Sequence, residues 1–407
     1  MASESRIRTT LGPFTLENPF ILASGPPTAT ADQIRHAFDA GWAGAVIKTI
    51  RPDEMVITDV SPRFSAWKDR DSTLLGFENI ELLSKKSVSY WLIEISKLRR
   101  EFPDKLLIAS IMAGADPAEW QDLALKIQSA GAHAIELNFS CPHGMPERGL
   151  GAAIGQQADL VRELTTHVKK ITTIPLIVKL TPNVTDIIPI AQAAIKGGTD
   201  MISAINTIQC LIGIDLDTFF PIPSVGGYST YGGYSGPAVK PVGLRVVSQI
   251  AQAGSTPVIG IGGISSWNDA TEYILAGASA VQVCSAVMWR GYGIIRELTT
   301  GLSEYLEEKG LSGPDVIRGK ALSQITSHET LNRNIRGVPF VNQDTCTKCG
   351  TCVISCRDGG YQAIRMTNKG VAIDQERCDN CSLCSLVCPS KSITMISIRM
   401  DRQGAKS

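Results

Sequence analysis

The sequence predicts an α/β protein in which a large (β/α)8 barrel is followed by a small cysteine-rich unit. Two observations support this prediction. Short apolar runs alternate with amphipathic stretches through the first three quarters of the chain, and eight of the 11 cysteines crowd between Cys346 and Cys388. A chain of 407 residues, 43% of them hydrophobic, is long enough for one large core and one small core.

Eight apolar runs are the predicted strands. They read PFILAS from Pro19, GAVIKT from Gly44, LLIASI from Leu106, HAIELNF from His133, PLIVKL from Pro175, MISAIN from Met201, PVIGIGG from Pro257 and AVQVCSA from Ala280. Continuous apolar runs suit parallel strands that are buried on both faces. The intervening stretches stop at glycine-containing segments such as DAGWAG and SAGAHA, which are typical of helix ends. Eight such units favour a barrel over a doubly wound sheet, which usually has fewer strands.

Polar and basic residues follow the predicted strands, at the end of a barrel where function resides. They are Ser24, Lys48, Thr49, Asn138, Ser140, Cys141, Lys179, Asn206, Thr207, Gly262, Gly263, Cys284 and Ser285. The two glycines and Ser285 follow the seventh and eighth strands, where such barrels commonly bind a phosphate through backbone N–H groups. Two long connections, 50–105 and 208–256, are predicted to serve as lids or substrate contacts at this mouth.

The C-terminal cysteines form two runs with the spacing C-x2-C-x2-C-x3-C. The runs are Cys346, Cys349, Cys352, Cys356 and Cys378, Cys381, Cys384, Cys388. This spacing predicts two [4Fe-4S] clusters in which the fourth cysteine of each run ligates the other cluster. Cys388 then joins the first three cysteines, and Cys356 joins the second set. Arg357 stands where a proline would follow the first run, but no ligand is lost. A pair of four-cysteine zinc sites is the alternative.

The predicted domains are a barrel over 1–309, a connector over 310–340, a ferredoxin-like unit over 341–398 and a tail over 399–407. With 39 basic and 39 acidic residues, the chain gives no indication of a nucleic acid or membrane partner. We find no signal peptide and no apolar stretch of membrane-spanning length, so we expect a cytoplasmic protein. No G-x-G-x-x-G stands between a strand and a helix, which argues against a nicotinamide-binding fold in this chain.

An iron–sulfur unit joined to a barrel implies that electrons pass to or from a group bound in the barrel. A flavin that carries a phosphate fits the predicted mouth, with Lys48 or Lys179 near the ring to stabilise its reduced, anionic form. Each lysine can alternatively be paired with a carboxylate at a strand end.

Five segments carry a resemblance to a known family. They are LNFSCPHGMPERGLG, VKLTPNVTD, GFENIELLS, YGGYSGPAVKPVGLR and VQVCSAV. The chain closely resembles the dihydropyrimidine dehydrogenase family, in particular its bacterial subunits with a pyrimidine site, FMN and two clusters. The resemblance implies a dihydroorotate dehydrogenase-like barrel and reduction of uracil or thymine. It also implies electrons from a separate FAD flavoprotein that oxidises NAD(P)H, and a homo-oligomer assembled with that partner.

The resemblance also implies roles for single residues. Cys141 would protonate C5 of the pyrimidine while the flavin N5 delivers hydride to C6. The pyrimidine would be bound by Asn79, Asn138, Asn206 and Thr207, with Glu81 as a further candidate. The FMN contacts would be Ser24, Lys48, Thr49, Asn138, Lys179, Gly236, Gly262, Gly263, Cys284 and Ser285.

Cys141 lies at the end of a strand, away from every other cysteine. A packed core thiol or a metal ligand acting with His143 are alternatives to a reactive group. A thiol with an ordinary pKa of about 8.5 is mostly protonated at neutral pH and can donate a proton. The segment Gly144–Gly151 is predicted to be a mobile lid, ordered by His143. Cys210 matches no chemical residue and is interpreted as an ordinary thiol.

Three rival functions stay open. A dihydroorotate dehydrogenase would need a cation for the carboxylate of its ring, and no dedicated basic residue stands beside the asparagines. A flavin reductase of another unsaturated ring is the second rival. The third is an electron-transfer subunit whose barrel performs no chemistry of its own.

Overall fold

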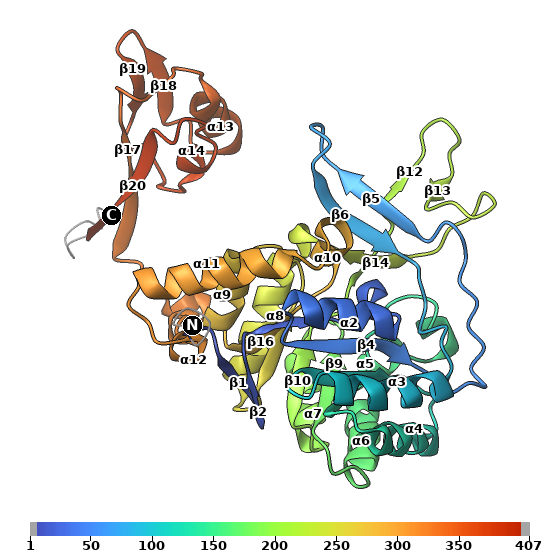
Figure 1. Ribbon diagram of the computed structural model, residues 1–407. Coiled ribbons are helices and arrows are strands. Elements are labelled where there is room, and N and C mark those ends of the chain that lie inside the picture. The colour runs from blue at the N-terminus through green and yellow to red at the C-terminus, as the bar shows by residue number, and fades with distance from the viewer. Residues whose placement is uncertain (1–5, 400–407) are drawn as a thin grey trace. The chain divides into compact units, whose positions relative to one another are not determined.

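The computed structural model describes residues 6–399, which belong to two compact units, Met1–Gln324 and Ile325–Ser407 (Figure 1). The predicted connector, 310–340, is divided between them. Its first part contains α12 (Pro314–Ile317) and η4 (Leu322–Gln324), which follow the barrel helices. The predicted tail lies outside the described residues, apart from Arg399.

Within residues 6–399, eight parallel strands close into a barrel in the order β3, β4, β7, β8, β9, β10, β15, β16 and back to β3. Their bounds are Phe20–Leu22, Gly44–Ile50, Leu106–Ile111, Ala134–Asn138, Leu176–Leu180, Met201–Ala204, Val258–Ile261 and Ala278–Val283. Each strand falls on one of the eight predicted runs. The barrel is therefore confirmed, and the doubly wound alternative is excluded.

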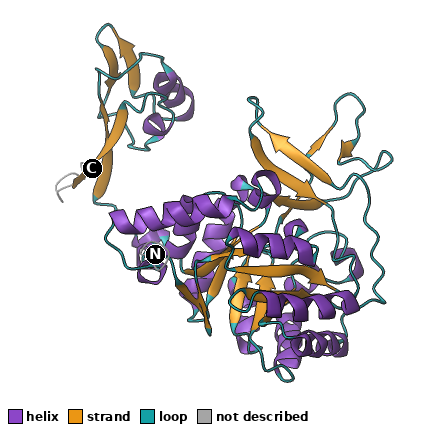
Figure 2. Ribbon diagram, in the orientation of Figure 1, coloured by secondary structure: helices purple, strands orange, loops and turns teal. Residues whose placement is uncertain are grey.

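Helices surround the barrel strands (Figure 2). They are α2 (Ala31–Ala40), α3 (Val88–Glu101), α4 (Pro117–Ala130), α6 (Ala158–Lys169), α7 (Ile188–Lys196), α8 (Lys240–Ala253), α9 (Trp267–Leu275) and α11 (Ile294–Glu308). Gly41 and Gly131 end α2 and α4 in the left-handed conformation, as their predicted helix stops require. Fully buried Trp42, Trp91 and Trp120 belong to the core cluster that helices and strands share. No described helix combines the length and apolar character needed to span a membrane.

An N-terminal hairpin closes one end of the barrel. Its strands are β1 (Thr9–Leu11) and β2 (Phe14–Leu16). Leu11 and Leu16 belong to one buried cluster with barrel residues that include Leu106 and Met201, the first residues of β7 and β10. The hairpin therefore covers the N-terminal ends of the strands and leaves the C-terminal ends for the site.

The two long connections form a second sheet, which the sequence analysis did not predict. The first supplies β5 (Phe64–Lys68) and β6 (Leu74–Asn79), and the second supplies β11 (Ile208–Cys210) and β14 (Gly232–Ser235). These strands pair antiparallel in the order β11, β14, β6, β5, with Gly233 opposite Asn79. A ribbon of β12 (Gly213–Ile214) and β13 (Pro221–Ile222) extends the second connection (Figure 1).

Short helices complete the mouth of the barrel. They are η1 (Pro26–Thr28), η2 (Pro146–Arg148), α5 (Ala152–Gly155), η3 (Pro237–Val239) and α10 (Ser285–Arg290). Each follows a barrel strand or the second sheet. They carry the backbone back from the strand ends toward the outer helices.

The second unit is built from two hairpin-like pairs. After η5 (His328–Thr330), β17 (Ile335–Val341) pairs antiparallel with β20 (Ile393–Arg399), and β18 (Ile364–Thr367) pairs with β19 (Gly370–Ile373). The helices α13 (Thr351–Gly359) and α14 (Leu383–Leu386) carry cysteines of the two runs. The small core comprises Ile364, Val371 and Ile393 together with the buried Cys352 and Cys384. Two of the clustered cysteine side chains thus take part in the packing of this unit.

Candidate active site

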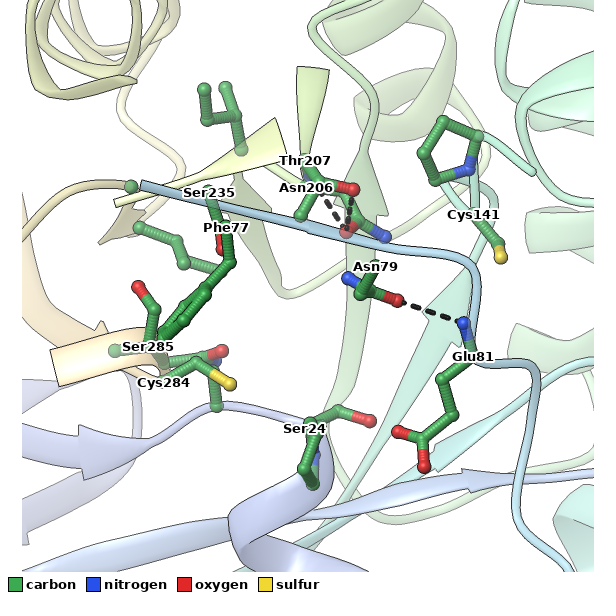
Figure 3. A pocket seen from close by; sticks show the side chains of 18 of the residues that line it. Ser24, Phe77, Asn79, Glu81, Cys141, Asn206, Thr207, Ser235, Cys284 and Ser285 are labelled. Atoms are coloured by element: carbon green, nitrogen blue, oxygen red, sulfur yellow. Dashed lines mark hydrogen bonds between the residues drawn. The ribbon is translucent and has the colours of Figure 1, made fainter. Parts of the chain in front are cut away.

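A cavity of about 1070 Å³, counting space open to solvent, lies at the C-terminal ends of the barrel strands (Figure 3). It brings together nearly all of the predicted barrel site. The lining includes Ser24, Lys48, Thr49, Asn79, Asn138, Cys141, Lys179, Asn206, Thr207, Gly262, Gly263, Cys284 and Ser285. Gly236 is outside the lining, although a Cβ on Gly263 would approach the carbonyl oxygen of Gly236 to 2.8 Å.

A chain of hydrogen bonds crosses the strand ends at the floor of the cavity. The Ser24 and Thr49 hydroxyls are 3.2 Å apart, and Asn138 Nδ2 donates to Thr49 Oγ1 at 2.9 Å. The Ser140 hydroxyl donates to Asn138 Oδ1 at 2.7 Å and accepts from Asn206 Nδ2 at 2.9 Å. These contacts fix the orientation of two predicted substrate amides, so that each presents its remaining donor or acceptor sites in a defined direction.

The second sheet supplies the opposite wall. Asn79 ends β6, and its Oδ1 accepts from the backbone N–H of Glu81 at 3.2 Å. Phe77 and Tyr234, from paired strands of this sheet, also line the cavity. Sequence reasoning missed both aromatic residues. The alternating runs FSAWK and LLGFEN, separated by a polar turn, are the signal that would have predicted a hairpin here.

Cys141 is buried at the edge of the cavity, and its thiol donates to the carbonyl of His143 at 3.5 Å. Burial raises the pKa of the Cys141 thiol to about 11, although Lys179 and Lys48 act in the opposite direction. The thiol therefore carries its proton throughout the neutral range. A thiol held in this form is a proton donor and a poor nucleophile.

The raised pKa predicts slow alkylation of Cys141. At pH 8 we expect iodoacetamide to react with it roughly 10²-fold more slowly than with a thiol of ordinary pKa, because the thiolate is the nucleophile. The rate should rise about tenfold per pH unit up to the raised pKa. Mass spectrometry of the Cys141 peptide after timed exposure at several pH values measures this rate. A rate that levels off near pH 8 would instead indicate a thiolate stabilised by the lysines.

The segment after Cys141 folds back against it. The backbone N–H of Ala152 donates to the carbonyl of Cys141 at 2.9 Å, and a side chain on Gly151 would approach that oxygen to 2.7 Å. His143 is buried, and its Nε2 lies 2.8 Å from the carbonyl oxygen of Glu81. His143 thus joins the predicted lid to the segment after β6, in keeping with an ordering role. Mobility of the lid remains a prediction.

Both predicted lysines are paired with carboxylates. Lys48 Nζ lies 2.5 Å from Glu81 Oε2, and Lys179 Nζ lies 3.9 Å from Glu136 Oε1. Glu136 is fully buried in the barrel, where the Ser203 hydroxyl donates to it at 2.9 Å. Both lysines therefore lie near a carboxylate of the chain, as the ion-pair alternative predicts. Because both lysines also line the cavity, a flavin contact by either of them remains a prediction.

One feature of the cavity fits a flavin. On its floor, Gln282 Oε1 is buried and has no hydrogen-bond partner among the described residues. An unpaired buried acceptor is costly, and an N–H of a bound ring system would satisfy it. Sequence reasoning missed Gln282, which lies inside the apolar run of β16.

The predicted phosphate end is defined by close backbone packing. Gly263 has a φ of +71°, and a Cβ there would approach the N–H nitrogen of Lys240 to 2.7 Å and the carbonyl of Gly236 to 2.8 Å. Only glycine therefore fits between the two loops, and the backbone of 262–263 stays accessible from the cavity. Ser285 begins α10 beside it.

In the second unit, two smaller cavities collect the eight clustered cysteines. One is lined by Cys346, Cys349, Cys352 and Cys388, and the other by Cys356, Cys378, Cys381 and Cys384. These are the two cross-run sets that the spacing predicts. The backbone N–H of Ser392 donates to Cys388 Sγ at 3.3 Å, a contact that favours a thiolate. All eleven cysteines lie within the described residues, and none forms a disulfide.

The cysteine geometry disfavours the zinc alternative. Zinc would require four sulfurs at about 2.3 Å from one point. Among the described residues, no three His, Cys, Asp or Glu side chains are close enough to hold a single metal ion. Sulfurs spread around a cavity suit a multi-iron cluster, with thiolate ligands at its corners.

Comparison with known proteins agrees with this architecture. Residues 6–306 match the dihydroorotate dehydrogenase family model, and residues 339–395 match a 4Fe-4S dicluster domain. The chain is 39% identical to the NAD-dependent dihydropyrimidine dehydrogenase subunit PreA of Escherichia coli (strain K12) over 396 residues. The aligned region covers 95% of this chain and 94% of that protein.

Two further relatives differ in how much they cover. The chloroplastic dihydropyrimidine dehydrogenase (NADP(+)) of Arabidopsis thaliana is 38% identical over 340 residues, 81% of this chain and 80% of that protein. The catalytic subunit of dihydroorotate dehydrogenase B (NAD(+)) of Pyrococcus abyssi is 41% identical over 306 residues, which are 75% of this chain and 96% of that protein.

The fold and the matches define an oxidoreductase with a flavin-dependent barrel and an iron–sulfur unit. Within this class, the chain belongs to the dihydropyrimidine dehydrogenase family, because the identity to its members extends beyond the length of the barrel match.

Proposed function

We propose that the protein reduces the 5,6 double bond of a neutral pyrimidine, uracil or thymine, with FMN in the barrel cavity. The observation that carries the proposal is the placement of a protonated thiol, that of Cys141, in a single cavity with the oriented amides of Asn79, Asn138 and Asn206. The family of the chain supports the same reaction. The reaction is reversible, since the same groups serve both directions.

The chain's own residues bind the ring and supply the proton. The three asparagines and Thr207 offer donors and acceptors to the carbonyl and N–H edges of a pyrimidine. The buried thiol of Cys141 delivers a proton to C5, and burial by the folded lid keeps water from that proton. Bound FMN supplies the hydride to C6. Its contacts would be Ser24, Lys48, Thr49, Asn138, Lys179, Gly236, Gly262, Gly263, Cys284 and Ser285.

We further propose that two [4Fe-4S] clusters carry the electrons. One would be held by Cys346, Cys349, Cys352 and Cys388, and the other by Cys356, Cys378, Cys381 and Cys384. A separate FAD flavoprotein that oxidises NAD(P)H would supply the electrons. The relative PreA is itself named as a subunit. We propose that copies of this chain assemble with such a partner into a hetero-oligomer.

An anaerobic experiment on the purified full chain tests the reaction. After its flavin and iron contents are recorded, the protein is reduced with dithionite, the excess is removed, and uracil, thymine or orotate is added. We expect uracil and thymine to reoxidise the flavin and orotate to leave it reduced. Chromatography should find dihydrouracil or dihydrothymine in amounts that match the reoxidised flavin.

Other outcomes identify the rivals. Reoxidation by orotate alone would make the chain a dihydroorotate dehydrogenase. A reduced, flavin-loaded protein that ignores all three rings would exclude the pyrimidine reaction and leave a reductase of another ring. A chain that retains iron but no flavin would favour an electron-transfer subunit.

A further inference from the structure

One acidic side chain stands among the described residues that line the barrel cavity, and it is Glu81. It follows Asn79, to which its backbone N–H donates at 3.2 Å. Its side chain is only 10% exposed. Figure 3 shows Glu81 and Asn79 next to each other on the segment that leaves β6, and Cys141 also lines the cavity. Glu81 thus belongs to the part of the cavity that we assign to the substrate.

The carboxylate of Glu81 holds two cations. Its Oε2 lies 2.5 Å from Lys48 Nζ, and its Oε1 lies 3.1 Å from Arg63 Nε. Of these two cations, only Lys48 lines the cavity. Lys179 is the other lysine of the lining, and it faces the buried Glu136. Lys48 is therefore in close contact with its carboxylate, whereas Lys179 Nζ is 3.9 Å from Glu136 Oε1, an atom without a hydrogen-bond partner among the described residues.

This arrangement is unsuited to a substrate that brings its own carboxylate. Such a group would enter near Glu81, be repelled by it, and find Lys48 already paired with Glu81. In a partly buried site, like charges a few ångströms apart interact far more strongly than in water. A neutral pyrimidine avoids this repulsion and leaves the Lys48–Glu81–Arg63 cluster intact.

We propose that Glu81 is a specificity-determining residue that excludes ring carboxylates by occupying Lys48 and Arg63. The inference rests on the proposed pyrimidine reaction and goes further by assigning the choice of ring to one side chain. A barrel of this kind can also serve a carboxylated ring. The dihydroorotate dehydrogenase B catalytic subunit of Pyrococcus abyssi shares 41% identity with this chain over 306 residues.

The test is Glu81→Gln in the full, flavin-loaded chain. Glutamine keeps the size of the side chain and removes its charge, which leaves Lys48 and Arg63 without their carboxylate partner. The dissociation constants of orotate and uracil are measured from the change in flavin absorbance on titration, without turnover. We expect orotate to bind the variant about 10- to 100-fold more tightly than the unchanged protein, and uracil to change far less.

Asp59→Asn is the matched control. Asp59 is buried in the same connection, pairs with Lys85 at 3.0 Å and accepts from the backbone N–H of Leu82 at 2.8 Å, but it does not line the cavity. Its replacement removes one negative charge from the same segment. Orotate affinity should stay within about twofold of the unchanged protein, because Asp59 does not line the cavity and pairs with Lys85, which does not line it either.

The outcomes separate this inference from the proposed function. If the unchanged protein binds uracil and not orotate, and Glu81→Gln gains orotate binding that Asp59→Asn does not, the inference stands. If Glu81→Gln still excludes orotate, or the unchanged protein already binds it as well as uracil, the inference is wrong. Failure of every variant to bind uracil would overturn the proposed function as well.

Discussion

Cys141→Ala is expected to lower the rate of pyrimidine reduction by about 10²- to 10⁴-fold, equivalent to about 3 to 5 kcal/mol of transition-state stabilisation. The physical reason is that Cys141 lines the same cavity as the oriented asparagines, and burial keeps its thiol protonated. Without it, the proton for C5 must come from water, although the position of Cys141 is buried. Single-turnover reoxidation of the reduced flavin by uracil measures the effect.

Two further readouts distinguish a chemical role from a structural one. The alanine variant should keep its flavin and its affinity for uracil, because the amides that we expect to bind the ring are unchanged. Cys141→Ser should recover only a small part of the rate, since a hydroxyl is a much weaker acid than a thiol. If the reduction rate of the alanine variant stays within about threefold of that of the unchanged protein, Cys141 is a packed core thiol and not the proton donor.

Cys210→Ala is the control for removing a half-buried thiol near the same wall. Cys210 ends β11, outside the cavity lining, and the carboxylate of Glu78 lies beside it. Burial and that carboxylate raise the pKa of the Cys210 thiol to about 12. These surroundings agree with an ordinary thiol. Turnover of this variant should match that of the unchanged protein.

The barrel could be predicted because its strands are buried on both faces. Residues such as Val46, Ile108 and Ile177 are fully buried, so continuous apolar runs mark their strands in the sequence. The second sheet has a weaker signal. Its strand β5 is mostly exposed, with Trp67 on the surface, and alternation over five residues is easily taken for a loop.

The site was predictable where it follows the strand ends and unpredictable where it depends on tertiary placement. Lys48, Lys179 and Ser285 could be found because a barrel gathers the residues that follow its strands at one mouth. The pairing of Glu81 with both Lys48 and Arg63 could not be found in this way. These residues come from β4 and from two separate parts of a long connection, and only folding of β5 against β6 brings the latter two together.

The cysteine unit permits a test of which cysteines share a cluster. In-run ligation would group Cys388 with Cys378, Cys381 and Cys384, whereas the observed cavities group it with Cys346, Cys349 and Cys352. Cys388→Ala is expected to remove one cluster, so that iron falls from about eight to about four atoms per chain. Electron delivery from a nicotinamide-oxidising partner should be lost, while uracil still reoxidises flavin that has been reduced by dithionite.

Double variants decide between the two groupings. When Cys349→Ala is added to Cys388→Ala, no further iron should be lost, because both cysteines belong to one cavity. Adding Cys381→Ala should remove the remaining iron, because Cys381 belongs to the other cavity. Cys349 and Cys381 are both exposed, so the two additions disturb the packing of the unit to a similar extent. The reverse pattern would establish in-run ligation, and equal losses from both additions would mean that removal of one cluster destabilises its neighbour.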